Sequence, residues 1–129
     1  MNLKNYFSEK TGLGVISTAN DNGEVNGAIY AKPHVLGDNT VAFIMRDRLT
    51  RANLQRNGRA HYMFIEHEHG YRGVRLSLLM TEEVKDREAI AALSRRNTNE
   101  NDEAEERFLV SFKVEKSLAL IGDQEIEFN

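Results

Sequence analysis

The pattern of apolar and polar positions predicts a chain built mainly of β-strands. Alternation is clearest where Val74, Leu76, Leu78 and Met80 are separated by single residues that include Arg75 and Ser77. A period of two places one side of a strand against a core and the other toward water. The expected strands are residues 14–20, 25–33, 41–46, 59–66, 72–84 and 107–114, with a short seventh at 118–121.

Turn-forming residues separate the first three strands and favour antiparallel pairing. Asp21-Asn22-Gly23 and Gly37-Asp38-Asn39 stand between them, and Asn and Gly tolerate the positive φ angles of tight turns. Pro33, the single proline, marks the end of the second strand or an edge of the sheet. We therefore expect these three strands to form a meander.

Short helices accompany the strands. One is expected at residues 2–10, a second at 50–56 with Thr50 as its N-cap, and a third from Asp86 to about residue 96. Residues 97–106 are polar and acidic without periodicity, which predicts a mobile loop.

Six or seven antiparallel strands predict a closed or nearly closed barrel, because closure removes exposed sheet edges. The length of 129 residues fits one domain spanning residues 1–129. Residues 41–46 are apolar on both faces, so the outer face of this strand needs a cover. That requirement favours an oligomer, although a ligand or a covering helix would serve equally well.

Composition narrows the possible chemistry. Cysteine is absent, which excludes disulfides, thiolate catalysis and Cys-bound metal centres. The chain has no P-loop, no G-x-G-x-x-G turn and no G-x-S-x-G elbow. Residues 1–6 lack the apolar core of a signal peptide and no run has transmembrane length, so we expect a cytoplasmic protein without membrane contact. The net charge of -3 disfavours nonspecific nucleic-acid binding.

Two local clusters have a simpler interpretation than a functional one. In Glu66-His67-Glu68-His69, two histidines on one strand face could chelate a metal. The cluster precedes Gly70, so a solvated loop is favoured and no metal site is expected. Five arginines between residues 46 and 59 could bind nucleic acid, but the nearby aromatic residues lie in apolar strands and are expected to be buried.

Residues 41–54 combine an apolar strand, a basic turn and the beginning of a helix. Arg46, Arg48 and Arg51 lie near the expected helix start, where unpaired N–H groups and the helix dipole attract anions. This combination makes a candidate phosphate site, although from this stretch alone a solvated turn with scattered arginines is favoured.

The order and spacing of these features resemble the pyridoxamine 5′-phosphate oxidase-like FMN-binding split-barrel family. The matching segments are Gly14-Val15-Ile16-Ser17-Thr18-Ala19, a Gly-containing turn, Val25-Asn26-Gly27-Ala28-Ile29-Tyr30-Ala31, the apolar run 41–45, the basic turn and Arg51-Ala52-Asn53-Leu54. The resemblance covers residues 5–114. It implies a six-stranded antiparallel Greek-key split barrel that forms a homodimer, with FMN at the subunit interface.

The resemblance also implies a set of cofactor-binding residues. The isoalloxazine ring would lie against the second and third strands, at Ala28, Ile29, Tyr30, Phe43, Ile44 and Met45. The phosphate would lie at the turn before the small helix, at Arg46, Arg48, Leu49 and Thr50, with Asn53 in support. Leu49 stands where many relatives carry a basic residue, so Arg46, Arg48 or Arg51 would supply the charge.

The implied function is hydride or electron transfer at a bound flavin. The chain lacks the Arg- and His-bearing C-terminal segment of true pyridoxamine 5′-phosphate oxidases, so vitamin B6 oxidation is not expected. No side chain stands out as a general acid or base, although Tyr30 and Arg75 could approach the ring or a substrate. The alternatives are a noncatalytic carrier of flavin, haem or a deazaflavin, and a ligand-free dimeric interaction domain.

Overall fold

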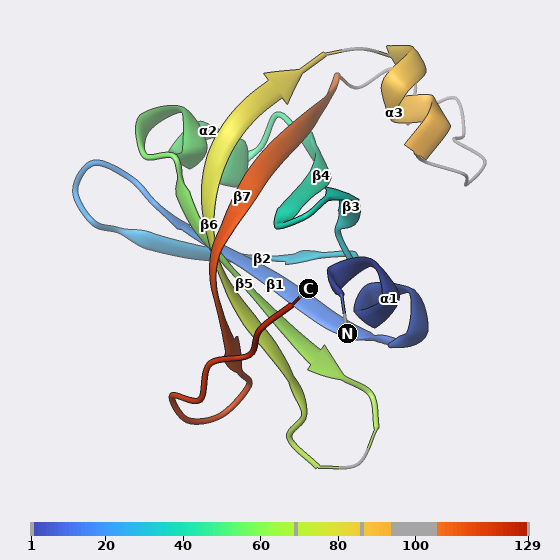
Figure 1. Cartoon of the computed structure of the whole chain (residues 1–129). Helices are drawn as coiled ribbons and strands as arrows, with labels where there is room; N and C mark the ends of the chain where they lie inside the picture. The colour runs from blue at the N-terminus through green and yellow to red at the C-terminus, as the bar shows by residue number, and fades with distance from the viewer. Residues whose placement is uncertain (1, 69, 86, 94–105, 129) are drawn as a thin grey trace.

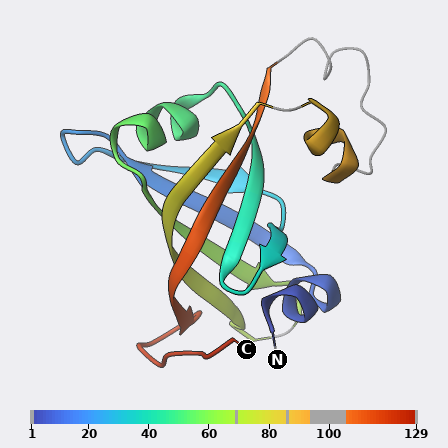
Figure 2. The same ribbon diagram turned by 45° about the horizontal axis from the view of Figure 1, so that its top comes forward.

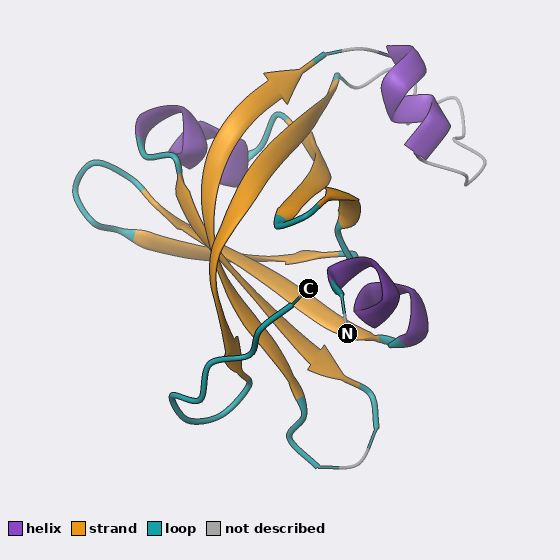
Figure 3. Ribbon diagram, in the orientation of Figure 1, coloured by secondary structure: helices purple, strands orange, loops and turns teal. Residues whose placement is uncertain are grey.

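The computed structural model describes residues 2–68, 70–85, 87–93 and 106–128, which form a curved antiparallel sheet with short helices (Figures 1 and 3). The strands are β1 (Gly12–Ala19), β2 (Val25–Tyr30), β3 (His34–Gly37), β4 (Thr40–Arg46), β5 (Arg59–Glu66), β6 (Gly73–Val84) and β7 (Arg107–Ala119). The helices are α1 (Leu3–Glu9), α2 (Leu49–Arg56) and α3 (Arg87–Leu93). A mainly β, antiparallel architecture with short flanking helices is confirmed.

The strands follow the order β2-β1-β5-β6-β7-β4-β3, and neighbouring strands are antiparallel. Strands β5, β6 and β7 pair with one another in the order of the chain. Strand β4 pairs with β7, and α2 connects β4 to β5 along the chain. This connection gives the Greek-key arrangement of four strands. Figure 2 shows β4, β6 and β7 crossing in front of β1 and β5, so the sheet folds over itself around a core.

The sheet has seven strands and is open, which corrects the expectation of six strands in a closed or nearly closed barrel. The additional strand is β3, which pairs with β4 across a turn where Asn39 has a φ of 56°. Strand β2 ends at Tyr30, before Pro33, a residue that has no N–H to donate to a neighbouring strand. Within the described residues β2 and β3 are the two edges of the sheet and do not pair with each other.

Alternation along the strands sends one set of side chains into the core. The fully buried members include Ile16, Tyr62, Phe64, Leu76, Leu78 and Phe112. Helix α1 closes one end of the core, because Phe7 packs edge-on against Phe64 with ring centroids 5.4 Å apart. A Cβ at Gly14 would collide with the Tyr62 hydroxyl, so glycine allows β1 to pair closely with β5.

The ends of several elements differ from the sequence prediction. Helix α2 begins at Leu49 with Arg48 as its N-cap residue, so the prediction that Thr50 is the N-cap was wrong. Strand β7 continues to Ala119, so residues 118–121 do not form a separate strand. Asp86 and all of the predicted loop 97–106 except its last residue lie outside the described part of the chain.

The outer face of β4 is covered by helix α3. Ile90 is only 2% exposed and forms a second apolar cluster with Ala42 and Leu109, against which Ile44 also packs. The apolar outer face of this strand therefore has a cover within the same chain. It no longer supplies an argument for an oligomer.

Candidate functional site

The predicted phosphate site is a tight turn between a strand and a helix. Strand β4 ends at Arg46, and α2 begins at Leu49. The Arg48 N–H donates a hydrogen bond of 2.9 Å to the Arg46 carbonyl, which holds the turn closed. No side chain caps α2 at Arg48, and the turn carries two arginines. Uncapped N–H groups and the positive end of the helix dipole are suited to an anion.

Four side chains from three elements meet at this turn, and we call Tyr30, Phe43, Arg48 and Thr50 the Tyr30 cluster. Burial raises the pKa of Tyr30, whereas a hydrogen bond with Thr50 and the charge of Arg48 lower it. The Tyr30 ring packs edge-on against Phe43, with centroids 6.1 Å apart. The end of β2, the middle of β4 and the start of α2 are thereby joined beside the open edge of the sheet.

A buried hydrogen bond fixes α2 against β1. The Asn53 side chain donates from Nδ2 to Thr18 Oγ1 at 3.1 Å, and both residues are buried. Asn53 therefore supports the turn, and no bound group is needed to explain its burial. Sequence reasoning missed Thr18 as its partner, although a polar residue at an inward position two after Ile16 was the available signal.

The six residues predicted for the ring do not share one surface. Phe43 and Met45 point into the core and are almost completely buried, so only their backbone could touch a ligand. Ile44 faces the opposite side, toward α3. Ile29 is 73% exposed on the outer side of β2, whereas Ala28 is half-buried. Contact of a flavin ring with these strands stays a prediction.

The arginines near the turn have different roles. Arg51 Nε donates to Glu83 at 2.7 Å, its Nη1 donates to Asp47 at 3.2 Å, and its guanidinium lies 3.7 Å from the centre of the Phe108 ring. Arg51 thus fixes α2 to β6 and β7. Leu49 is 57% exposed beside the turn. Arg46 and Arg48 are the two arginines of the turn itself, at the end of β4 and at the N-cap position of α2.

Arg75 does not point to this turn. Its guanidinium donates hydrogen bonds to the carbonyls of Ala119, at 2.9 Å, and Gly122. These bonds hold the segment that follows β7. Arg75 is therefore a structural residue of that segment in this chain.

The described residues contain no group of three or more side chains that could hold a metal ion. His67 is exposed after β5, and His69 lies outside the described part of the chain. No helix in the described part is long and apolar enough to cross a membrane.

Comparisons with known proteins point to the fold. Neither a protein-family model nor a curated protein matches the sequence. The chain is similar to the structure of an FMN-binding protein from Syntrophomonas wolfei, with 21% identity, a TM-score of 0.74 and coverage of 90% of this chain and 82% of that one.

Two further structures show the same likeness. A Clostridium acetobutylicum protein related to general stress protein 26, of the pyridoxinephosphate oxidase family, has 15% identity and a TM-score of 0.67, and the match covers 98% of this chain and 91% of that one. An F420 reductase has 17% identity and a TM-score of 0.64, with 87% and 93% covered. The chain therefore has the split-barrel fold found in FMN-binding and pyridoxamine 5′-phosphate oxidase-like proteins.

Proposed function

We propose that this chain is a small FMN-binding flavoprotein that acts as a homodimer and carries out hydride or electron transfer. The observation that carries the proposal is the uncapped start of α2 beside the Tyr30 cluster, in a fold shared with an FMN-binding protein. A bound FMN would supply the redox chemistry, and the chain would supply binding and orientation.

The residues at the turn fit a phosphate group. Arg46 and Arg48 would provide charge, and the first N–H groups of α2 would provide hydrogen bonds. Thr50 is 2% exposed, so its hydroxyl would position Tyr30 rather than touch the phosphate. Leu49 would add exposed apolar surface beside the phosphate instead of a third charge.

The surface proposed for the homodimer is the outer sheet face. This face consists of Leu13, Val15, Val25, Ile29, Met63 and Ile65, which lie in register on β1, β2 and β5. Val25 and Ile29 lie on the same face of β2 and are 74% and 73% exposed. Exposed apolar surface of this kind often marks an interaction site. Tyr30 follows Ile29 on the edge strand β2, and its side chain points to the other face. A second subunit that reaches around this edge would contact the Tyr30 cluster and could complete a cofactor site.

Absorbance and FMN titration of the purified protein test the proposal. We expect flavin bands that are released on denaturation, or saturable binding of added FMN. Replacing both Arg48→Gln and Thr50→Val should raise the Kd for FMN at least about tenfold, because the charge of Arg48 and the hydroxyl that positions Tyr30 are both lost. The control is Arg59→Gln, an exposed arginine paired with Glu115, which should leave the Kd unchanged. A colourless protein that gains no flavin signal would refute the proposal.

A deazaflavin is the second candidate cofactor, because the F420 reductase structure shares the fold. The phosphate features of the turn fit either molecule. Parallel titrations with FMN and with coenzyme F420 separate the two candidates. We expect the tighter Kd for FMN, and tighter binding of F420 would assign the deazaflavin instead.

A further inference from the structure

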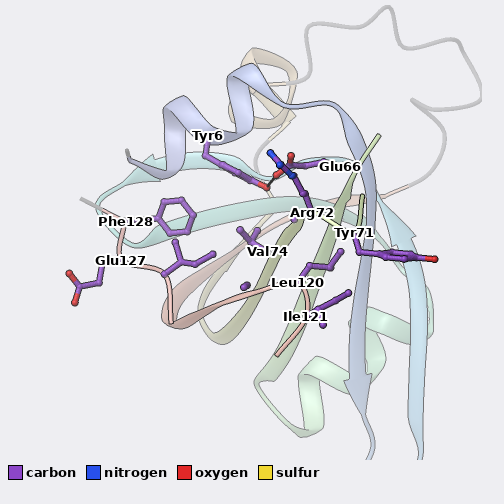
Figure 4. A pocket seen from close by; sticks show the side chains of 12 residues that line it. Tyr6, Glu66, Tyr71, Arg72, Val74, Leu120, Ile121, Glu127 and Phe128 are labelled. Carbon is purple, nitrogen blue, oxygen red and sulfur yellow. Dashed lines mark hydrogen bonds between the residues drawn. The ribbon is translucent and has the colours of Figure 1, made fainter. Parts of the chain in front are cut away.

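A hollow lies at the other end of β5 and β6 from the turn. It has a volume of about 370 Å³, within the range of small-molecule sites. It forms where β5 ends, β6 begins and the segment after β7 crosses (Figure 4). Its apolar wall consists of Val74, Leu120, Ile121, Ile126 and Phe128.

A buried carboxylate forms one wall of this hollow. Glu66 is 8% exposed, and its Oε2 accepts a 2.5 Å hydrogen bond from the Tyr6 hydroxyl. Lys10 Nζ forms an ion pair with Oε1 at 3.8 Å, a distance too long for a hydrogen bond. A carboxylate has about four acceptor sites, and Tyr6 is the only side chain of the described residues that donates to this one. Glu66 can therefore accept from a ligand N–H group.

An arginine stands beside that carboxylate. The Glu66 N–H donates to the Arg72 carbonyl at 2.9 Å, so the two residues are cross-strand neighbours. Both line the hollow, and Figure 4 shows Tyr6, Glu66 and Arg72 converging on one side of it. No ion pair within the described part of the chain includes Arg72.

We propose that this hollow binds an apolar α-amino acid. The ammonium group would lie against Glu66, the carboxylate against Arg72, and the side chain against Val74, Ile126 and Phe128. Such a zwitterion satisfies two neighbouring opposite charges and an apolar wall together, whereas an anion or a cation alone would face one charge of its own sign. The proposal does not depend on flavin binding.

Titration of the full chain with L-leucine and L-phenylalanine, followed by two-dimensional NMR, tests the proposal. We expect saturable shifts of the Gly73, Val74 and Leu120 amides at ligand concentrations up to about 20 mM. Leucinamide lacks the carboxylate and N-acetyl-leucine lacks the ammonium, so each should bind at least about tenfold more weakly. Shifts that do not saturate, or equal binding of all three compounds, would overturn the proposal.

Two variants test which side chain binds each charged group of the amino acid. Arg72→Gln should weaken leucine binding about tenfold and leave leucinamide binding unchanged, because only leucine has a carboxylate that Arg72 could bind. The matched control is Arg56→Gln. Arg56 is an exposed arginine at the end of α2, and it pairs with Asp21. Glu66→Gln keeps an acceptor for Tyr6 and should weaken leucine but not N-acetyl-leucine.

Equal effects of Arg72→Gln and Arg56→Gln, or an unaltered Kd in Arg72→Gln and Glu66→Gln, would contradict the assignment. FMN affinity measured on the same samples should be the same in Arg72→Gln as in the parent protein. Loss of flavin binding and loss of amino-acid binding are thus observed separately.

Discussion

At the scale of single residues, the polar groups in the core are those that have a partner. Asn53 donates to Thr18, and the Tyr6 hydroxyl donates to Glu66. Burial and the neighbouring carboxylate raise the pKa of Tyr6 far above its ordinary value, so it stays a donor across the physiological range. Each pair joins a helix to a strand more than thirty positions away along the chain, so each specifies a tertiary contact as well as satisfying a polar group.

The Thr18–Asn53 bond can be tested with a double-mutant cycle. Thr18→Val keeps the side-chain shape but leaves Asn53 Nδ2 without its acceptor. We expect Thr18→Val and Asn53→Leu each to lower the free energy of unfolding by about 1–3 kcal/mol in urea denaturation. The double variant should lose less than the sum, since no unpaired group is left behind. Thr11→Val, at an exposed position, should change stability by less than about 0.5 kcal/mol. Additive losses would show that the bond contributes nothing.

At the scale of elements, the short helices cover apolar surface that the strands leave exposed. Helix α1 closes one end of the core, α2 carries the turn, and α3 covers the outer face of β4. Helix α3 has seven residues, too short to be stable in isolation, so its contacts with β4 and β7 must hold it in place.

Truncating the central contact of α3 tests this role. Ile90→Ala should lower the free energy of unfolding by about 2 kcal/mol, because it removes buried methyl groups over Ala42 and Leu109. The measurement is urea denaturation, with Ala92→Ser on the exposed side of the same helix as the control. An unchanged stability of Ile90→Ala would mean that α3 does not cover β4 in solution.

At the scale of the whole molecule, two surfaces have different characters. The outer sheet face is apolar, with Leu13, Val25 and Ile29 exposed, and it ends at the edge strand β2, which also carries Tyr30. The outer face of the sheet at β4 is already covered by α3. A second subunit is therefore better placed on β1, β2 and β5 than on β4.

A charge on the outer sheet face should prevent dimer formation. Ile29→Glu would bury an unpaired carboxylate in the proposed interface. In analytical ultracentrifugation we therefore expect the parent protein to sediment as a dimer and the variant as a monomer. FMN affinity should fall as well, since the proposed site needs both subunits. Leu36→Glu places the same charge at an exposed apolar position on β3 and should remain dimeric. A parent protein that sediments as a monomer would contradict the proposed interface directly.

Much of this molecule follows from the local pattern of its residues. Alternation specified the positions of β5 and β6, and the order and spacing of the segments together gave the resemblance to the split-barrel family. Strand β3 was missed because its four residues between Pro33 and a turn are too few to show a period. The cofactor residues were placed by resemblance, and the structure unites Tyr30, Phe43, Arg48 and Thr50 among them.

The sequence by itself determined six of the seven strands and that residues 41–54 join a strand, a basic turn and a helix. Hydrophobic period, turn residues and charge are local properties, so they can be read along the chain. The tertiary structure alone decided that α3 covers β4, that Thr18 meets Asn53, and that Glu66 and Arg72 share a hollow. Those outcomes depend on which distant segments pack together, and many pairings of the same strands would satisfy the local pattern equally well.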